Sequence, residues 1–264
     1  MSFIRIGAVI RRHWLVLWRG PHRWFEIAFW PVMDAILWGS LGVYMSTAAT
    51  GSANQTVVAL MLGGMTLFWT LTVVQMTVSL SVMDETNTRN LLNVLSTSVK
   101  PIEYLLGVAA FGLMKLAMTM TTITVMTTLV YGFALNSLGW NSLPILLLLI
   151  VNGWALGFVI LGLVLRFGPS AEILTWGLNY VMLAVSGVFF PPSALPGGLG
   201  DVVRWLPTGL AFDAMRTIVR GEPTPVGTLW AAAGGSIVVL VLALAFCGWM
   251  LRVFRRRGFV TRYS

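Results

Sequence analysis

Six long apolar segments divide this chain, and their length is the feature that most restricts its fold. They cover approximately residues 25–45, 56–82, 108–131, 143–165, 171–190 and 227–251. A helix needs about 20 apolar residues to cross the hydrocarbon core of a bilayer. Charged residues make up only 10% of the chain, whereas a typical soluble domain has about 25%. The sequence therefore predicts an all-α membrane protein with six transmembrane helices.

The distribution of positive charge predicts which ends of these helices face the cytoplasm. Of the 17 Lys and Arg residues, 13 lie before the first segment, after the last, or in the connections that follow the second and fourth. The remaining connections hold three, and Lys115 lies inside the third segment. Cytoplasmic loops carry an excess of Lys and Arg. We therefore expect both termini in the cytoplasm, and membrane lipids rather than nucleic acid as the partner of this basic chain.

Residues 1–20 are predicted to form an amphipathic helix before the first membrane segment. At 100° per residue, Arg5, Arg12 and Arg19 share one side of that helix. The opposite side is aromatic and aliphatic and holds Phe3, Ile6, Ile10, Trp14 and Leu17. This pattern is typical of an interfacial helix that lies in the plane of the lipid headgroups. A cytoplasmic helix packed on a partner protein is the alternative.

The connection over residues 83–104 is the longest on the predicted cytoplasmic side. Asp84 or Asn87 can cap a short helix over 83–97, and leucine and valine side chains give this helix an apolar side. A lone cytoplasmic helix between two membrane spans suits the docking of a cytosolic partner. A solvated helical loop is the alternative.

The region over residues 191–220 is broken into pieces too short to span a membrane. The fifth apolar segment stops at Pro191-Pro192, and further breaks occur at Pro196-Gly197-Gly198 and at Pro207. Pieces of about 8–12 residues cannot cross the hydrocarbon core. Non-helical backbone is tolerated at membrane depth where it is buried in protein or faces water. We therefore predict an extracytoplasmic re-entrant helical hairpin between spans five and six, which points to a transport protein.

The sequence offers no enzyme site. It contains no Gly-x-x-x-x-Gly-Lys-[Ser/Thr] motif and no soluble stretch long enough to fold an ATPase domain. His13 and His22 both precede the first membrane segment, and Cys247 is the single cysteine. We therefore expect no catalytic residue, metal or cofactor in this chain.

Polar residues within the apolar segments are candidates for a transport pathway. A charged side chain at the centre of a membrane helix costs about 2.5–3.5 kcal/mol on insertion scales, so Asp34 and Lys115 are functional candidates. Pairing of Lys115 with Asp34 or Glu172 would neutralise both charges. Thr122 and Trp69 are further pathway candidates, although threonine in a buried span more often bonds its own i−4 carbonyl.

Together these features resemble the membrane subunits of ABC-2 type ABC transporters, an exporter class with six spans per subunit. The resemblance covers nearly the whole chain as a single domain, residues 1–264. On the cytoplasmic side it rests on Glu85, Arg89, Asn90, Leu91, Leu92 and Pro101. On the other side it rests on Gly187, the run Phe189-Phe190-Pro191, Leu195-Pro196, Pro207, Asp213 and Arg216.

The resemblance implies a dimer of permease subunits, identical or different, in the bacterial inner membrane. Separate cytoplasmic ABC ATP-binding subunits would hold ATP and Mg. The 83–97 helix would be the coupling helix, with ATPase contacts from Glu85, Arg89, Asn90, Leu91 and Leu92. The hairpin would cap the far end of a central pathway, with the gate candidates Phe190, Pro191, Pro207, Asp213 and Arg216.

An ion-coupled secondary transporter is the alternative function, with Asp34 and Lys115 as relay groups. Inverted repeats are the expected sequence mark of such transporters. No convincing internal repeat relates the first three apolar segments to the last three. A membrane enzyme acting on lipids would need His, Asp or Cys side chains clustered at one membrane face, a pattern that the sequence lacks.

Overall fold

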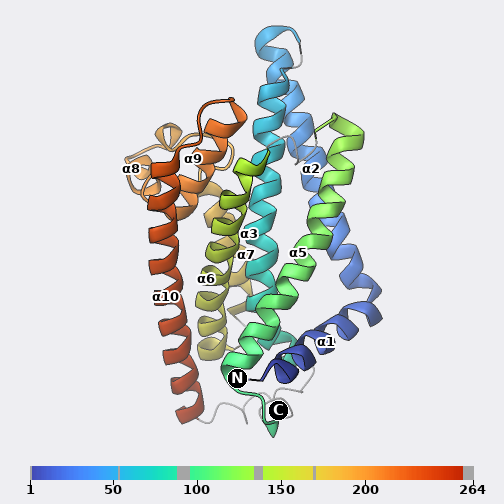
Figure 1. Cartoon of the computed structure of the whole chain (residues 1–264), viewed down its shortest axis with the longest axis vertical. Helices are drawn as coiled ribbons and strands as arrows, with labels where there is room; N and C mark the ends of the chain where they lie inside the picture. Colours follow the sequence, from blue (N-terminus) through green and yellow to red (C-terminus); the bar gives the residue numbers. More distant parts are fainter. Residues whose placement is uncertain (1, 53, 88–95, 134–138, 169–170, 258–264) are drawn as a thin grey trace.

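A bundle of long helices forms the body of the protein (Figure 1). The computed structural model describes residues 2–52, 54–87, 96–133, 139–168 and 171–257, and no strand occurs among them. The α-helices are α1 (Phe3–Arg19), α2 (Pro21–Thr50), α3 (Gln55–Asn87), α5 (Pro101–Tyr131), α6 (Leu143–Phe167), α7 (Glu172–Val185), α8 (Leu199–Val203), α9 (Pro207–Val219) and α10 (Val226–Arg257). Two short 3-10 turns, η2 (Trp140–Ser142) and η4 (Pro192–Ala194), precede α6 and α8.

Five of the six predicted membrane segments are confirmed as helices long and apolar enough to cross a bilayer. These are α2, α3, α5, α6 and α10. The fifth predicted segment, 171–190, forms the shorter helix α7 of 14 residues. The chain then turns at Gly187, whose φ of 64° lies in the left-handed region that glycine adopts readily. The number of six spans therefore stays a prediction.

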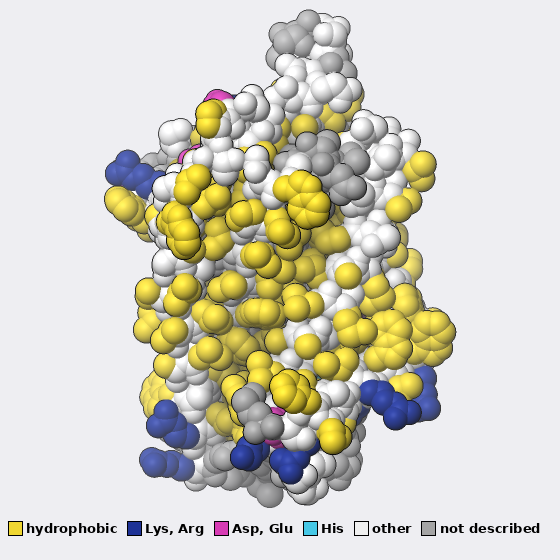
Figure 2. All heavy atoms as spheres, in the orientation of Figure 1, with side chains coloured by type: hydrophobic (Ala, Val, Ile, Leu, Met, Phe, Trp, Pro, Cys, Tyr) yellow, Lys and Arg dark blue, Asp and Glu magenta, His cyan; other side chains and the backbone are white. Residues whose placement is uncertain are grey.

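The two ends of the bundle differ in structure and in charge. The beginning of α1 and the end of α10 lie at one end, and α8 and α9 lie at the other (Figure 1). Figure 2 shows hydrophobic side chains over the middle of the surface, with most of the visible Lys and Arg gathered at the end where α1 lies. This arrangement is that of a multi-pass membrane protein with an asymmetric charge distribution.

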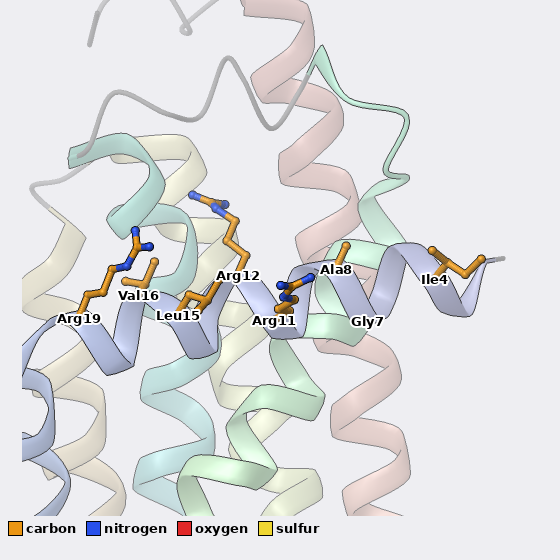
Figure 3. A pocket seen from close by; sticks show the side chains of 8 residues that line it. All are labelled: Ile4, Gly7, Ala8, Arg11, Arg12, Leu15, Val16 and Arg19. Carbon is orange, nitrogen blue, oxygen red and sulfur yellow. The ribbon is translucent and has the colours of Figure 1, made fainter.

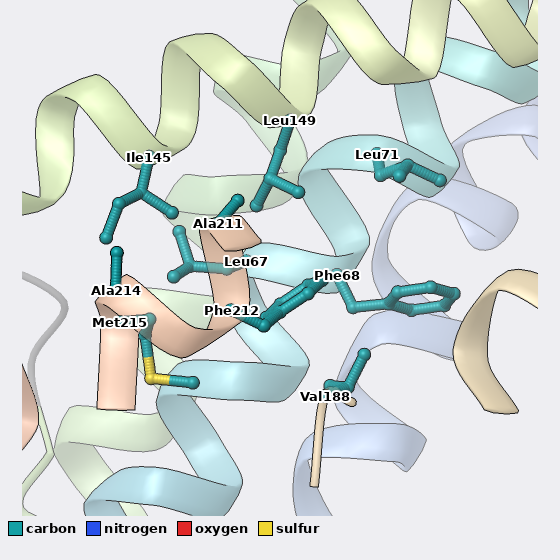
Figure 4. Packing of buried hydrophobic residues seen from close by; sticks show 10 residues of the cluster. All are labelled: Leu67, Phe68, Leu71, Ile145, Leu149, Val188, Ala211, Phe212, Ala214 and Met215. Carbon is teal, nitrogen blue, oxygen red and sulfur yellow. The ribbon is translucent and has the colours of Figure 1, made fainter. Parts of the chain in front are cut away.

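Helix α9 is built into the core rather than lying on the surface. It packs against α10, α6 and α3. Its residues Ala211, Phe212, Ala214 and Met215 are fully buried and meet side chains of α3 and α6 (Figure 4). The breaks predicted before it are confirmed, because Pro207 begins α9 and Gly197 and Gly198 adopt positive φ before α8.

Helices α3 and α6 approach each other closely at two glycines. The spacing Gly153-x-x-x-Gly157 allows such an approach, and the structure uses it. A Cβ on Gly153 would lie 2.8 Å from the Leu71 carbonyl oxygen, and one on Gly157 would lie 2.8 Å from Val78 Cβ. Only a residue without a side chain fits at either position.

Replacing Gly153 with valine is expected to lower the free energy of unfolding by about 1–2 kcal/mol, because the helices must separate to admit the side chain. Thermal unfolding of the purified protein measures this. Gly248→Val in α10 is the matched control, since a Cβ there meets nothing within 4 Å. Equal melting temperatures of the two variants would contradict the close packing of α3 and α6.

The structure corrects the predicted boundaries of the 83–104 connection. Helix α3 continues without a break to Asn87, so Asp84 lies inside it and does not cap a new helix. Helix α5 begins at Pro101, within the connection predicted to extend to residue 104. The coupling helix expected over 83–97 falls largely on residues 88–95, which lie outside the described residues, as do Arg89, Asn90, Leu91 and Leu92.

Candidate functional site

The end of α3 is held by arginines from the two preceding helices. Glu85 is buried, with 2% of its surface exposed, and both of its carboxylate oxygens accept hydrogen bonds from the Arg12 guanidinium of α1. The neighbouring Asp84 accepts a hydrogen bond from Arg23 Nη1 of α2 at 2.9 Å. Bidentate pairs of this kind are among the strongest hydrogen bonds in proteins. Glu85, predicted to contact an ATPase, thus binds α1 of its own chain.

The start of α5 is held in a similar way by the buried carboxylate of Glu103, which is 1% exposed. Its oxygens accept hydrogen bonds from the backbone N–H of Ser2 at 2.9 Å and of Lys100 at 3.0 Å. Arg5 Nη1 approaches the same carboxylate at 3.5 Å. Glu103 therefore caps α5 and at the same time ties the beginning of α1 to it.

The environment of α1 differs in part from the predicted one. Arg5 and Arg12 face buried carboxylates of the same chain rather than lipid headgroups. On the side that packs against α5, Val9 and Leu17 are buried, and Val9 fits against Gly107, where a Cβ would lie 2.7 Å from Val9 Cβ. The predicted amphipathic helix is present, but its cationic stripe serves mainly to attach it to α3 and α5.

The outer side of α1 forms an open groove of about 560 Å³ (Figure 3). Apolar and basic side chains alternate along it, among them Ile4, Ala8, Leu15, Arg11 and Arg19. Arg11 and Arg12 are adjacent in sequence but project from different sides of the helix, and Arg12 extends toward the end of α3 (Figure 3). The exposed face of α1 is therefore mixed apolar and cationic.

A polar cavity of about 240 Å³ lies where α1, α2, α3 and α5 meet. Charged and imidazole side chains line it, namely His13, His22, Arg23, Glu26, Asp84 and Lys115. A second cavity of about 190 Å³ shares Glu26 and Lys115 with the first and adds the indoles of Trp30, Trp69 and Trp176. Lys115 forms no hydrogen bond or ion pair with any described residue. Charged side chains and indole rings thus line two cavities that share Glu26 and Lys115.

The hypothetical Asp34–Lys115 pair is not formed by these two described residues. Lys115 faces the cavities with Glu26, whereas Asp34 lines neither of them. Asp34 lies near Trp69, but the buried Nε1 of this indole makes no well-formed hydrogen bond to it. The side chain of Glu172, the other predicted partner of Lys115, lies outside the described part of the chain.

Several threonine hydroxyls of α5 form hydrogen bonds within the helix itself. Thr122 Oγ1 donates a hydrogen bond to the Met118 carbonyl at 3.1 Å, and Thr121 Oγ1 does the same to Ala117 at 2.8 Å. Bonding to the i−4 carbonyl satisfies a hydroxyl without a partner from another helix. Neither described cavity includes Thr122, and its place in a pathway stays a prediction.

His13 is held inside the α1–α5 contact. Its ring stacks on Phe111, with 5.4 Å between ring centroids and 26° between the planes. Its Nε2 is buried and has no hydrogen-bond partner among the described residues. Burial lowers the pKa of His13 below its ordinary value of 6.5, while the negative charge of Glu85 opposes the shift. The folded protein therefore favours the neutral imidazole.

We expect thermal stability to fall as the pH drops below about 6.5, because protonation of His13 is then favoured in the unfolded chain before the folded one. The contribution of His13 is fully present above this pH and is lost as the pH decreases toward the lowered pKa. Melting temperatures across this range, compared for wild type and His13→Gln, measure it. An unchanged pH profile in His13→Gln would contradict the prediction.

At the far end of the bundle, Arg216 joins α9 to the turn after α7. Its Nη1 donates a hydrogen bond to the Gly187 carbonyl, and its Nη2 donates to Asp213 Oδ1 at 3.2 Å. Burial lowers the pKa of the Arg216 guanidinium, and the Asp213 carboxylate opposes the shift. Phe189 in the same turn stacks on Trp38 of α2, with ring centroids 3.6 Å apart. Arg216 thus holds the 186–190 turn against the bundle.

The other gate candidates occupy different surroundings. Pro207 is buried at the start of α9, whereas Phe190 and Pro191 are exposed. Asp213 is largely exposed, with its side chain 58% accessible. The structure brings Asp213 and Arg216 into contact, and Phe190 lies in the turn that Arg216 holds.

Sequence reasoning missed a buried polar contact between α3 and α7. Thr72 Oγ1 donates a hydrogen bond to Asn179 Oδ1 at 3.1 Å, and Gln75 Nε2 reaches the Thr175 carbonyl at 3.5 Å. All four residues are buried. Polar side chains spaced three or four residues apart within an apolar helix were the available signal, since such residues bond across helix interfaces. Among the described residues, no group of three His, Cys, Asp or Glu side chains could hold a metal ion.

Comparison with known protein families gives a match that covers most of the bundle. A family model described as ABC-2 family transporter protein matches residues 40–252, which run from the middle of α2 to the last turns of α10. Comparison with curated proteins gives no significant match.

Proposed function

Because this chain belongs to the ABC-2 transporter family, we propose that it works as the permease subunit of an ATP-driven exporter, with the ATP-binding domains on separate chains. The family assignment makes it the membrane component of an ABC transporter, which has no catalytic role of its own. The observation that carries the proposal is the extent of the match, which includes nearly all of the bundle from α2 to α10.

The connection between α3 and α5 is the proposed contact with the ATP-binding subunit. It joins the end of α3 to the start of α5, which both lie at the end of the bundle where α1 lies (Figure 1) and where most of the visible Lys and Arg gather (Figure 2). This distribution supports a cytoplasmic position for this end and for both termini. The mixed apolar and cationic outer side of α1 supports contact with the lipid headgroups of a bacterial inner membrane. ATP and Mg would bind to the partner, and a second permease, identical or different, would complete the pathway.

Transport in this proposal is a population shift between inward-open and outward-open forms, driven by ATP-dependent closure of the partner. The polar cavity at Lys115 and the adjoining indole wall with Trp69 support a pathway entrance near α2 and α5. The buried α9 supports a re-entrant hairpin that closes the far end. A sixth span over the segment 171–190, of which α7 forms 14 residues, stays a prediction. Asp34 and Thr122 stay secondary pathway candidates.

The test is purification of the tagged chain from its native membranes in mild detergent, with mass spectrometry of the co-eluting proteins. The proposal predicts a stoichiometric ATP-binding subunit that is lost when Leu91 and Leu92 are both replaced by aspartate. The matched control replaces Leu199 and Val202 of α8 by aspartate, since both are exposed at the opposite end of the bundle.

Retention of the ATP-binding subunit by the control and its loss from the Leu91/Leu92 variant would support the proposed contact. Reproducible absence of any ATP-binding subunit from the wild type, in preparations that keep another membrane complex intact, would contradict an ATP-driven exporter.

A further inference from the structure

The polar cavity and the indole-lined cavity beside α5 have four lining residues in common. These are Glu26, Met76, Leu80 and Lys115. The cavities measure about 240 Å³ and about 190 Å³, whereas small-molecule sites typically measure about 300–1,000 Å³. A ligand of ordinary size would therefore extend through both, with a polar part in the first cavity and an apolar part in the second.

Two of the charged side chains in the polar cavity neutralise each other. Arg23 of α2 and Asp84 of α3 form an ion pair at 2.9 Å. Lys115 and Glu26 line both cavities and form no hydrogen bond or ion pair with a residue in the described ranges 2–52, 54–87, 96–133, 139–168 and 171–257. A positive and a negative charge thus remain for a ligand.

The position of Lys115 makes an unpaired charge costly. Phe111, one turn earlier in α5, packs against His13 and Leu17 of α1. Lys115 therefore lies one turn beyond the level of α1, toward the middle of the bundle. Charged side chains inside membrane proteins are rare unless they are paired or face a hydrated cavity. A ligand anion would supply the missing partner.

The second cavity supplies an apolar contact surface. Its indoles come from three helices, with Trp30 in α2, Trp69 in α3 and Trp176 in α7. Trp30 is 52% and Trp176 is 44% exposed, so this cavity opens at the surface of the bundle, where an acyl chain or an aromatic ring can enter from the membrane. Indole faces also attract cations, which agrees with a ligand that carries an ammonium group.

We propose that Lys115, Glu26 and the three indoles form a binding site for a zwitterionic amphiphile. Lys115 binds its phosphate or carboxylate, Glu26 binds its ammonium group, and the indoles hold its apolar part. A purely anionic ligand would bring a second negative charge beside Glu26, and a purely cationic ligand would leave Lys115 without a partner. As the substrate class of the permease this inference rests on the proposed function, whereas binding itself requires no ATP.

The experiment measures ligand binding to the tagged full chain, purified in mild detergent with the subunits that co-elute. The probe is lysophosphatidylethanolamine, whose head group carries a phosphate and a primary ammonium. Lysophosphatidylglycerol, which has the phosphate but no ammonium, is the matched ligand. Native mass spectrometry across a titration gives both dissociation constants, and we expect the wild type to bind the zwitterion more tightly.

The variants separate the two charges. Lys115→Met is expected to weaken binding of both lipids roughly tenfold or more, because a charge-assisted hydrogen bond to the phosphate is lost, and Lys115→Arg should retain binding. Glu26→Gln should weaken binding of the zwitterion alone and so remove the wild-type preference. Trp176→Ala should weaken binding of both lipids. The controls Arg252→Gln and Trp249→Ala, at an exposed arginine and an exposed indole of α10, should match the wild type.

Unchanged dissociation constants in Lys115→Met, or an unchanged preference in Glu26→Gln, would overturn the site. Because neither side chain has a partner among the described residues, both variants should keep the wild-type melting temperature, which shows that a loss of binding is not a loss of folding.

The same preparations distinguish a resident lipid from an exchangeable ligand. Diacyl phosphatidylethanolamine that co-purifies with the wild type but not with Lys115→Met would identify a resident lipid. Binding of the added probe by wild-type protein that carries no such lipid would identify an exchangeable ligand, as a substrate must be. Either result supports the site. Absence of an ATP-binding subunit would contradict the proposed function but leave these binding constants valid, whereas failure of the site would leave the ATP-binding subunit in place.

Discussion

Replacing Phe212 with alanine is expected to lower the free energy of unfolding by about 3–5 kcal/mol, the typical cost of truncating a buried aromatic side chain. Phe212 is fully buried in α9 and belongs to the cluster that includes Leu67, Leu149 and Met215 (Figure 4). Its loss would leave a cavity between α9 and the neighbouring helices α3 and α6. Thermal unfolding in detergent measures the effect.

Val202→Ala in the neighbouring α8 is the control for Phe212→Ala, because Val202 is 64% exposed and its truncation should change stability by less than about 0.5 kcal/mol. The comparison tests whether α9 is a core element. A melting temperature of Phe212→Ala equal to that of Val202→Ala would mean that α9 is not packed within the bundle.

Replacing Arg216 with glutamine is expected to cost about 2–3 kcal/mol, because a buried, charge-assisted hydrogen bond to the Gly187 carbonyl is lost and the carbonyl is left without this donor. The 186–190 turn would be released from α9. Melting temperature reports the loss of stability, and hydrogen exchange of the 186–190 amides reports the release of the turn.

The chain offers a matched control for this variant. Arg204 forms the same i,i+3 pair with Asp201, at 3.1 Å, but both side chains are more than half exposed. Because exposed ion pairs contribute only about 0–1 kcal/mol, Arg204→Gln should change stability little. A comparable loss in both variants would show that the burial of Arg216 and its bond to Gly187 have no special role.

The long helices could be predicted from the sequence because length and hydropathy alone determine them. Five of the predicted segments became α2, α3, α5, α6 and α10. Helix α9 was predicted only as a short piece of a re-entrant hairpin. Its burial depends on contacts with side chains of α3 and α6, such as Leu67 and Ile145, which no local pattern in residues 207–219 reveals.

The partners of the arginines in α1 could not be predicted from the sequence. The periodicity of Arg5 and Arg12 correctly indicated one cationic side of a helix. Their partners Glu103 and Glu85 are 98 and 73 residues away in sequence. A single sequence cannot decide between lipid phosphates and distant carboxylates as partners of such a stripe.

The Asp34–Lys115 hypothesis failed for a related reason. Charge alone makes any acidic and basic pair at similar membrane depth plausible, but helix rotation decides which side chains face each other. In the structure Lys115 shares its cavities with Glu26, and Asp34 faces Trp69. Helix rotation follows from tertiary packing, including the glycine contacts between α3 and α6.

The most direct test of the account is an electron cryo-microscopy structure of the complex purified from native membranes in lipid nanodiscs. We expect density for an ATP-binding subunit against the connection between α3 and α5, with Arg12 still bound to Glu85 beside the contact. An ATP-binding subunit attached elsewhere, for example at the end formed by α8 and α9, or a permease that occurs without one, would contradict it.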